Sequence, residues 1–461
     1  MIQFFDSLRG IKVPLQKEPR TSGKSADPVK MYVCGPTVYD LAHLGHGRSA
    51  VAFDLVRRFL EFCGYEVIFV FNTTDIEDKM IARAEKESIT VPELAARLIP
   101  EYKSDYSALA VKSPTHNPCA TEFIDQMVEL IKTLEKKGHT YVLADGVYFD
   151  IKTFPEYGKL SHQKLDELEA GARVEERKDK RNHQDFVLWK FKKEGEPSWP
   201  SPWGDGRPGW HIECSAMSKT LLGDSFDIHG GGLDLKFPHH ECEIAQSEAA
   251  SDKPLANIWM HNGYITVNKE KMSKSLGNFF TLREIFEKYN PRVVRFFLLS
   301  THYRSPIEYS TDALDQARAT LKTLDEFYLT NREAAVATST TAPAEPDTAL
   351  ITAFTEKLSN DMDIAGALAE MFEWMNSTSA TSASPKEPAK IIATLNRLNE
   401  VLQIFPVDFT LTEEQTTLLT ERASARAQKD WTKSDELRTE LSKLGVEVED
   451  GKSGTVVRPR L

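Results

Sequence analysis

The chain lacks the long apolar run that a membrane-spanning helix would require. No stretch of its 461 residues approaches the roughly 20 consecutive apolar side chains of such a span. The first ten residues, MIQFFDSLRG, also lack the apolar core of a signal peptide. Hydrophobic residues make up 41% of the chain and charged residues 27%, as in an ordinary globular protein. We therefore expect a cytoplasmic protein with no membrane partner.

Cysteine is also scarce. The five cysteines are an odd number scattered over a long chain, which argues against a disulfide framework. Reduced thiols are therefore available as metal ligands. The cysteines are Cys34, Cys63, Cys119, Cys214 and Cys242.

An excess of basic residues is missing as well. The net charge of -12 argues against a general polyanion binder, although a local basic groove can still contact a nucleic acid. The chain shows no internal repeat, and its length predicts roughly three or four domains rather than one core.

The N-terminal third has the pattern of a doubly wound parallel sheet. Residues 29–34 and 65–71 are continuous apolar runs typical of strands buried on both faces, and residues 50–62 have helical periodicity. The order strand, helix, strand predicts an α/β fold of the Rossmann type. Ligands bind such sheets beyond the carboxyl ends of the strands.

The remaining patterns divide the chain further. A helix over 122–137 and hairpin-like strands interrupt the sheet, which resumes with strands at 210–214, 226–229 and 257–260. Helical patterns at 350–374 and 389–404 should form a bundle, and the tail carries one more helix. We expect a catalytic Rossmann-type domain (1–113 and 194–262), an insertion (114–193), a region that contains the lysine-bearing loop 271–275 (263–332), an α-helical bundle (348–410) and a small C-terminal α+β domain (411–461).

Four residues have side chains of the types that bind zinc. Cys34 ends the first predicted strand, and Cys214 ends a later one. His239 and Glu243 follow a proline and, four residues apart, would share one helix face. The set of two sulfurs, one nitrogen and one oxygen suits four-coordinate zinc. Most free cysteines are buried packing residues, however, and spacing alone does not decide between these interpretations.

Two further patterns suit a site for a triphosphate. His43-Leu-Gly-His46 places two imidazoles around Gly45, which permits close approach of the backbone to a phosphate. Lys271-Met-Ser-Lys-Ser275 offers two cations on a segment followed by turn residues. Taken alone, the first could be a pair of cap or surface histidines, and the second a solvated loop.

A glycine run invites two interpretations. His229-Gly-Gly-Gly232 is too flexible for the interior of a strand. It is expected to form either a turn that brings backbone amides to a ligand or a simple hairpin loop.

Taken together, these motifs resemble those of cysteinyl-tRNA synthetases, which belong to class I. The motifs occur in the family's order and extend into the insertion and the tail, so the likeness spans nearly the whole chain. They are Met31-Tyr-Val-Cys-Gly-Pro-Thr-Val-Tyr-Asp40, His43-Leu-Gly-His46, Gly209-Trp-His-Ile-Glu-Cys-Ser-Ala-Met217, Phe237-Pro-His-His-Glu241, Lys271-Met-Ser-Lys-Ser275, Asp185-Phe-Val-Leu-Trp-Lys190 and Lys429-Asp-Trp431.

The resemblance implies a cysteine–tRNA ligase. Such an enzyme activates L-cysteine with ATP and Mg²⁺ and then transfers it to the 3′-terminal ribose of tRNA-Cys; we expect a monomer. The resemblance assigns a zinc site to Cys34, Cys214, His239 and Glu243. It assigns catalysis to His43, His46, Lys271 and Lys274, and contacts with ATP to His43, Gly45, His46 and Lys274. It places Thr74 and Trp210 in the amino-acid pocket, and Trp431 and Asp435 in the anticodon region.

The sequence departs from the family pattern at two points. Leu44 stands where isoleucine is common, a volume-conserving change. Cys242 lies between His239 and Glu243, and we expect an inert neighbour of the metal site. Two alternatives remain open: an enzyme that joins cysteine to an amino sugar, which lacks the anticodon-binding tail, and a non-catalytic RNA-binding paralogue.

Overall fold

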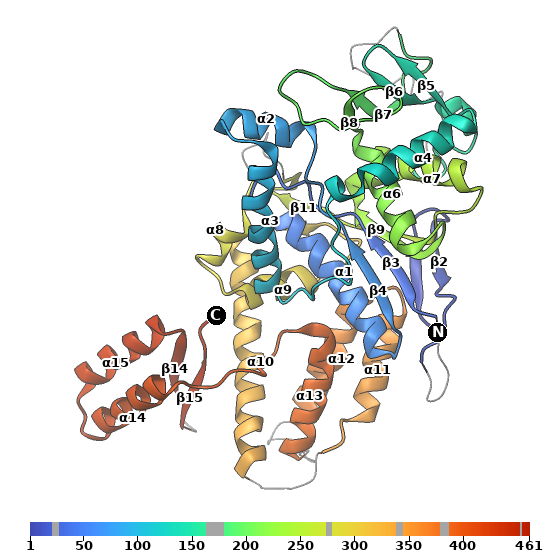
Figure 1. Cartoon of the computed structure of the whole chain (residues 1–461). Helices are drawn as coiled ribbons and strands as arrows, with labels where there is room; N and C mark the ends of the chain where they lie inside the picture. Colours follow the sequence, from blue (N-terminus) through green and yellow to red (C-terminus); the bar gives the residue numbers. More distant parts are fainter. Residues whose placement is uncertain (21–26, 163–178, 273–278, 338–343, 379–386, 452–453) are drawn as a thin grey trace. The chain divides into compact units, whose positions relative to one another are not determined.

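The computed structural model describes residues 1–20, 27–162, 179–272, 279–337, 344–378, 387–451 and 454–461 (Figure 1). None of the helices in these ranges combines the length and apolar character of a transmembrane span. The chain forms two compact units. The first comprises Met1–Arg283, His302–Ile307 and Ser359–Asp363, and the second comprises Glu284–Thr301, Glu308–Leu358 and Ile364–Leu461.

A parallel four-stranded sheet forms the centre of the first unit. Its strand order is β10 (Ala256–Asn262), β9 (Phe226–Gly232), β3 (Val29–Val33) and β4 (Val67–Phe71). The strands predicted at 29–34, 65–71, 226–229 and 257–260 are therefore confirmed, as is the doubly wound class (Figure 1). Since β4 extends the sheet from one side of β3 and β9 from the other, the strand order reverses between β3 and β9, where such folds bind ligands.

Helix α1 (Leu44–Phe62) connects β3 to β4. It was predicted from residue 50 but begins six residues earlier, immediately after the cap residue His43. Most of its residues are buried, among them Val51, Phe53 and Leu60. The apolar periodicity therefore detected the buried body of the helix and missed its first turn, in which two glycines and a histidine interrupt the pattern.

The glycine run belongs to strand β9, so the predicted turn is wrong. A Cβ atom at Gly230 would lie 2.4 Å from Cε1 of Phe53, and one at Gly231 would lie 2.9 Å from Cε1 of His240. Both contacts are closer than real Cβ atoms permit. The glycines allow helix α1 and a histidine ring to pack directly on the strand, a requirement that composition alone does not reveal.

The strand predicted at 210–214 is also wrong. Residues 210–222 form helix α6 (Trp210–Leu222), which begins after Gly209. Every residue from Ile212 to Ser218 is buried. A segment buried on all sides has no polar face, so its periodicity cannot distinguish a helix from a strand.

An antiparallel sheet contains three strands of the expected insertion (114–193) and one strand, β8 (Gly206–Pro208), that lies beyond its expected end. Its strand order is β5 (Thr140–Leu143), β6 (Gly146–Phe149), β7 (Phe186–Phe191) and β8. The helix predicted at 122–137 is confirmed as α4 (Ile124–Lys136), which packs against α6. The other elements up to Glu308 are β1 (Gln3–Asp6), β2 (Ile11–Pro14), α2 (Asp78–Glu87), α3 (Val91–Ala108), α7 (Glu241–Ser251), β11 (Ile265–Val267), β12 (Glu270–Lys271), α8 (Leu282–Phe286), α9 (Pro291–Leu299) and β13 (Ile307–Glu308).

The helical bundle belongs to the second unit. It contains α10 (Thr311–Ala337), α11 (Thr348–Ser359), α12 (Ile364–Thr378) and α13 (Pro388–Leu402). The single helical pattern at 350–374 is divided in two, because Asp361 and Met362 adopt positive φ angles of 63° and 57°. The Asp361 carboxylate accepts hydrogen bonds from Tyr303 Oη at 2.7 Å and from the Phe5 amide at 2.8 Å, which hold this break in place.

The C-terminal segment is a small α+β fold, as expected. It contains two helices rather than the one predicted, followed by a hairpin: α14 (Glu413–Ala427), α15 (Trp431–Lys443), β14 (Val446–Gly451) and β15 (Gly454–Pro459). Leu441, Val446 and Val448 form its core. The side chain of Asp430 caps α15 by accepting from the Lys433 amide at 3.0 Å.

Candidate metal centre and nucleotide cleft

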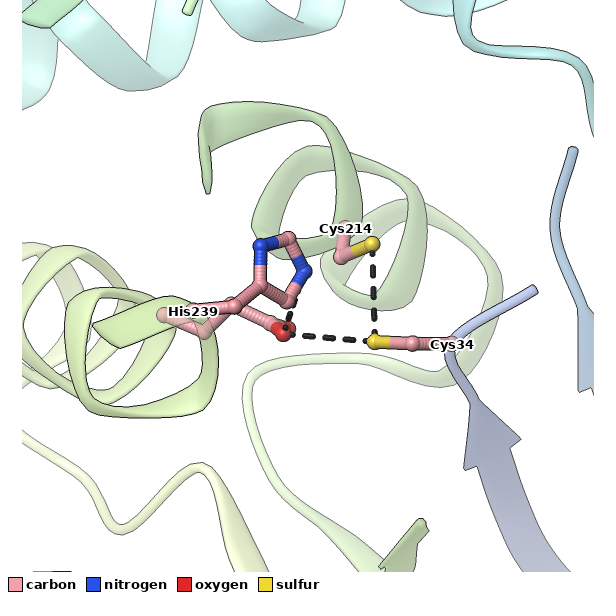
Figure 2. A group of neighbouring side chains, drawn as sticks. Cys34, Cys214 and His239 are labelled. Atoms are coloured by element: carbon pink, nitrogen blue, oxygen red, sulfur yellow. Dashed lines mark hydrogen bonds and ion pairs between the residues drawn. The ribbon is translucent and has the colours of Figure 1, made fainter. Parts of the chain in front are cut away.

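The four zinc-type residues converge in the fold. Cys34 follows β3, Cys214 lies in α6, and His239 lies in the helical turn before α7 (Figure 2). Glu243 lies in the first turn of α7. The Sγ atoms of Cys34 and Cys214 are 3.6 Å apart. Glu243 Oε1 lies 3.3 Å from Cys34 Sγ and 3.1 Å from His239 Nε2. One potential ligand atom from each residue lies within 4.8 Å of the other three, and all four residues are buried.

The charges of this cluster suit a cation. The hydrogen bond from Cys34, assisted by nearby His239, lowers the pKa of Cys214 to about 6. Although burial opposes ionisation of Glu243, His229 and His239 hold its pKa well below the usual value. Against the opposing effect of burial, the Glu243 and Cys214 anions raise the pKa of His239 to about 10, so a metal ion would displace the proton of this ring. The cluster therefore offers two sulfurs, one carboxylate and one ring nitrogen, a donor set that fits zinc.

A second layer of histidines surrounds the cluster. His229 Nε2 lies 2.9 Å from Glu243 Oε2, and His211 Nδ1 lies 3.0 Å from His239 Nδ1. Outer hydrogen bonds of this kind orient metal ligands. Sequence reasoning missed both roles. His229 begins the glycine run, for which the sequence predicts a turn or a loop rather than a strand. His211 directly follows the predicted pocket residue Trp210, and this position is its signal in the sequence.

The predicted amino-acid pocket adjoins this cluster. A cavity of about 320 Å³ is lined by Thr74, Trp210 and the cluster members Cys34, Cys214 and His239. The strand predicted at 210–214 would have put Trp210 and Cys214 at its two ends. Because the segment is a helix, the two residues instead lie one turn apart on the same face. The Trp210 ring centroid lies 4.4 Å from that of His239.

Thr74 is held by a carboxyl group. Its Oγ1 donates to Glu213 Oε2 over 2.9 Å, and both residues are buried. Glu213 directly precedes Cys214 in helix α6. The same helix therefore positions one candidate metal ligand and one neighbour of the amino-acid pocket.

His43 and His46 form the N-terminus of helix α1. His43 Nδ1 accepts from the amides of Gly45 at 3.0 Å and His46 at 3.3 Å, and His46 Nδ1 accepts from the His43 amide at 3.3 Å. The two rings are stacked with centroids 3.6 Å apart. Because each Nδ1 accepts a hydrogen bond, a neutral ring carries its proton on Nε2. Both residues line the same cavity as the cluster, at a helix terminus that favours anions.

The segment that follows the lysine motif pairs with the histidine motif. The Leu44 amide donates to the Phe280 carbonyl at 3.2 Å, and the Leu282 amide donates to the Ala42 carbonyl at 2.9 Å. Phe279 places its ring edge-on to His43, 5.0 Å between centroids. Backbone hydrogen bonds thus join the histidine motif to residues 280–282, more than 200 residues away in sequence.

Lys271 lies at the edge of the cavity. Its Nζ is 3.5 Å from Asp234 Oδ2 and 4.1 Å from the ring centroid of Tyr264. The predicted catalytic residue Lys274 lies outside the described residues.

Cys242 faces away from the metal cluster. Its Sγ lies 3.5 Å from Tyr157 Oη, and burial raises the pKa of this thiol well above its usual range. Within the described residues, two groups of side chains could share a metal ion, the four-donor cluster and the group of Cys34, His229, His240 and Glu243. Cys242 belongs to neither group.

The two predicted anticodon residues lie in helix α15. Trp431 is 56% exposed, and Asp435, one turn further along, is also exposed. The Arg426 guanidinium lies 5.5 Å from the Trp431 ring centroid. An exposed aromatic face beside a cation suits stacking with an unpaired base.

Two family models match the chain. Residues 21–319 match the catalytic domain of class I (C) tRNA synthetases, and residues 409–458 match the anticodon binding domain of cysteinyl-tRNA ligases.

Full-length relatives agree with these matches. A cysteine–tRNA ligase of Caldicellulosiruptor saccharolyticus is 47% identical, with 95% of this chain and 96% of the relative aligned. One from Pseudomonas fluorescens is 48% identical, with 93% and 94% aligned.

Solved structures share the fold at low sequence identity. The methionyl-tRNA synthetase of Mycobacterium tuberculosis bound to methionyl-adenylate has a TM-score of 0.60 and 16% identity, covering 82% of this chain and 90% of its own. A LeuRS of Agrobacterium radiobacter in a ternary complex with tRNA has a TM-score of 0.62 and 12% identity, covering 84% of each chain.

Proposed function

Since the chain belongs to the cysteinyl-tRNA synthetase family of class I, we propose that it is a cysteine–tRNA ligase. It activates L-cysteine with ATP to cysteinyl-adenylate and pyrophosphate, and then transfers cysteine to the 3′-terminal ribose of tRNA-Cys. The observation that carries this proposal is the buried Cys34, Cys214, His239 and Glu243 cluster, which opens into the same cavity as the His43–His46 motif.

We assign the selection of cysteine over serine to this four-donor cluster. The residues that would hold zinc are Cys34, Cys214, His239 and Glu243, whose donor set and charges fit the ion. Bound zinc would favour the thiolate of cysteine and offer little to the hydroxyl of serine. Trp210 and Thr74 would enclose the amino acid beside these ligands.

The activation step depends on positioning and on neutralisation of charge. The cysteine carboxylate attacks the α-phosphorus of ATP, and pyrophosphate departs. His43 and His46 would donate from Nε2 to phosphate oxygens, and Gly45 would contact the nucleotide while leaving room for the His43 ring. Lys271 and Lys274 would neutralise the negative charge that develops on the pyrophosphate as it leaves, and Mg²⁺ would accompany ATP. Such pre-positioned groups can supply most of the rate enhancement of a group transfer.

Transfer requires a bound tRNA. Trp431 and Asp435 would contact anticodon bases, one through its ring and the other through its carboxylate. The catalytic domain would comprise 1–113 and 194–262, interrupted by the insertion (114–193). The region of the Lys271–Ser275 loop and the tRNA-stem contacts (263–332), the bundle (348–410) and the anticodon domain (411–461) would follow along the chain. We expect the enzyme to act as a cytoplasmic monomer.

The two alternatives are less well supported. An amino-sugar ligase of this chemistry would not require the match of residues 409–458 to an anticodon binding domain. A non-catalytic paralogue would not require the nucleotide motif and the four-donor cluster to line one cavity.

Two assays test the proposal. Exchange of radiolabelled pyrophosphate into ATP should depend on cysteine and should be far slower with serine. Charging of tRNA-Cys should then distinguish a tRNA ligase from an amino-sugar ligase. Absence of cysteine-dependent exchange would refute the activation step, and exchange without charging would refute the choice of tRNA as acceptor.

A further inference from the structure

A buried arginine extends the histidine motif into the interior of the first unit. Arg48 lies in helix α1, two residues after His46, and is 1% exposed. Its Nη2 atom donates to the His302 carbonyl at 2.7 Å and to the Ser305 carbonyl at 3.4 Å. Residues 302–305 form a turn, closed by a hydrogen bond of 2.9 Å from the Ser305 amide to the His302 carbonyl. The guanidinium therefore joins the beginning of helix α1 to this turn.

The same turn holds the beginning of strand β11. The Gly263 amide donates to the Tyr303 carbonyl at 2.9 Å. On the other side, the Ile307 amide donates to the Tyr264 carbonyl, also at 2.9 Å. A Cβ atom at Gly263 would lie 2.4 Å from the carbonyl oxygen of Ser305, so glycine is needed for this close approach. The position of β11 therefore depends on the position of the turn.

Strand β11 in turn carries Lys271 to the edge of the cavity. Thr266 of β11 lies opposite Lys271 of β12, and the Met272 amide donates to the Ile265 carbonyl at 3.0 Å. Met272 is buried, and its Cε would lie 3.7 Å from a Cβ atom at Gly45 in the histidine motif. A displacement of β11 would therefore move Lys271 relative to the nucleotide motif.

The turn itself is held through its side chains. The buried carboxylate of Asp361 accepts from Tyr303 Oη at 2.7 Å and from Arg304 Nη2 at 2.6 Å. His302 Nε2 lies 2.8 Å from the Asp361 backbone carbonyl oxygen. The side chains of the turn thus contact Asp361, while its backbone carbonyls accept from Arg48 and from the start of β11. A turn fixed in this way transmits the position of helix α1 to β11, because packed interiors deform little.

We propose that Arg48 is a positioning residue for Lys271: through the turn at 302–305 and strand β11, it fixes where this cation meets the departing pyrophosphate. The inference rests on the proposed function, which gives Lys271 its role. Burial lowers the pKa of Arg48 to about 9, so the guanidinium remains a cation at neutral pH. Its planar shape fixes the directions of its N–H bonds, whereas a lysine ammonium rotates on a flexible stem.

Arg48→Lys keeps the charge and loses the fixed bond directions. In cysteine-dependent ATP–pyrophosphate exchange, kcat should fall about tenfold, because a displaced catalytic group is costly. The KM for ATP should change little, since Lys271 acts on charge that develops in the transition state. In a Lys271→Ala background the same change should lower kcat less than about twofold, because the two residues act through one path. Equal losses in both backgrounds would overturn the proposal.

Arg57→Lys is the matched control. Arg57 is another buried arginine of helix α1, and its Nη1 atom donates to the Ser113 carbonyl at 2.6 Å, away from the turn. The control makes the same chemical change and should leave kcat nearly unchanged, even if it lowers the free energy of unfolding. If Arg57→Lys and Arg48→Lys lower kcat alike, the effect is a general loss of helix packing and the proposal is wrong.

Gly263→Ala reaches the same path from its other end. The added methyl group would press on the Ser305 carbonyl and displace β11 while Arg48 stays in place. This variant should lower kcat as Arg48→Lys does, and it provides the test if Arg48→Lys does not fold. Adding Arg48→Lys to it should lower kcat little further. Normal activity in Gly263→Ala would contradict the path through β11.

Hydrogen–deuterium exchange of the full-length protein tests the anchoring without any activity. In peptides that cover 263–272, Arg48→Lys should accelerate deuterium uptake at the amides of Gly263 and Met272, whose hydrogen bonds hold β11. Arg57→Lys should not. If the wild type lacks cysteine-dependent pyrophosphate exchange, the proposed function fails, while deuterium uptake still decides whether Arg48 holds β11. Unchanged uptake in Arg48→Lys would overturn the proposal.

Discussion

At the scale of single residues, the amino-acid pocket depends on a hydrogen bond between two buried side chains. Thr74 Oγ1 donates to Glu213 Oε2, while the other oxygen, Oε1, has no hydrogen-bond partner in the described structure. Within the described residues, Thr74 is the hydrogen-bond donor to this buried carboxyl group, and leaving such a group without a donor costs about 1–3 kcal/mol of free energy. Glu213 adjoins Cys214, so this disturbance would be felt at the candidate metal centre.

Thr74→Val tests this hydrogen bond, since valine keeps the shape of threonine and lacks the donor. We expect the KM for cysteine in ATP–pyrophosphate exchange to rise about tenfold, which corresponds to about 1.4 kcal/mol. Thr74→Ser retains the hydroxyl and should change the KM far less. A raised KM in Thr74→Ser with a nearly unchanged KM in Thr74→Val would show that the methyl group, not the hydrogen bond, matters.

At the scale of elements, the start of helix α1 positions both histidines of the nucleotide motif. A Cβ atom at Gly45 would lie 2.9 Å from Cε1 and 3.0 Å from Nδ1 of His43, the ring nitrogen that caps the helix. Gly45→Ala should therefore displace the imidazole. We expect exchange activity to fall at least about tenfold, because small misplacements of catalytic groups are costly.

The control for Gly45→Ala is Leu44→Ile. Leu44 is fully buried, and this change conserves its volume. It should leave exchange activity within a small factor of the wild type. Circular dichroism should show both variants folded; a Gly45→Ala protein with normal activity would contradict the role assigned to this turn.

Strand β9 makes a separate prediction about stability. Gly230→Ala would place a methyl group 2.4 Å from the ring of buried Phe53. Overpacking of this kind costs about 1–3 kcal/mol, which denaturant unfolding can measure. Adding Phe53→Leu should restore part of the loss. If Gly230→Ala unfolds like the wild type, the glycine is not required for packing between helix and strand.

Elements with a clear apolar pattern could be predicted from the sequence, and those defined by tertiary packing could not. Residues 29–34 and 65–71 are apolar except at Lys30 and Glu66, because parallel strands are buried on both faces. The segment 210–214 is buried equally well as a helix, and the glycines of β9 are selected by Phe53 and His240, which lie far away in sequence. Neither requirement is visible in a local window.

At the scale of the whole molecule, the fold unites groups that are distant in sequence. Cys34, Cys214 and the His239–Glu243 pair come from three segments and meet where the strand order of the sheet reverses. Their residue types and the family resemblance predicted this set. The supporting contacts of His211 and His229, and those of Arg48 with the turn at 302–305, depend on packing between elements and were not predicted.

The central claim is that the four-donor cluster binds zinc and thereby selects cysteine. The most direct test measures zinc content together with cysteine and serine activation in Cys214→Ala, with Cys242→Ala as control, since both thiols are buried and only Cys214 belongs to the cluster. We predict about one zinc per chain in the wild type and the control. Cys214→Ala should lose most of its zinc and its preference for cysteine. Unchanged zinc content and discrimination in Cys214→Ala would contradict the account.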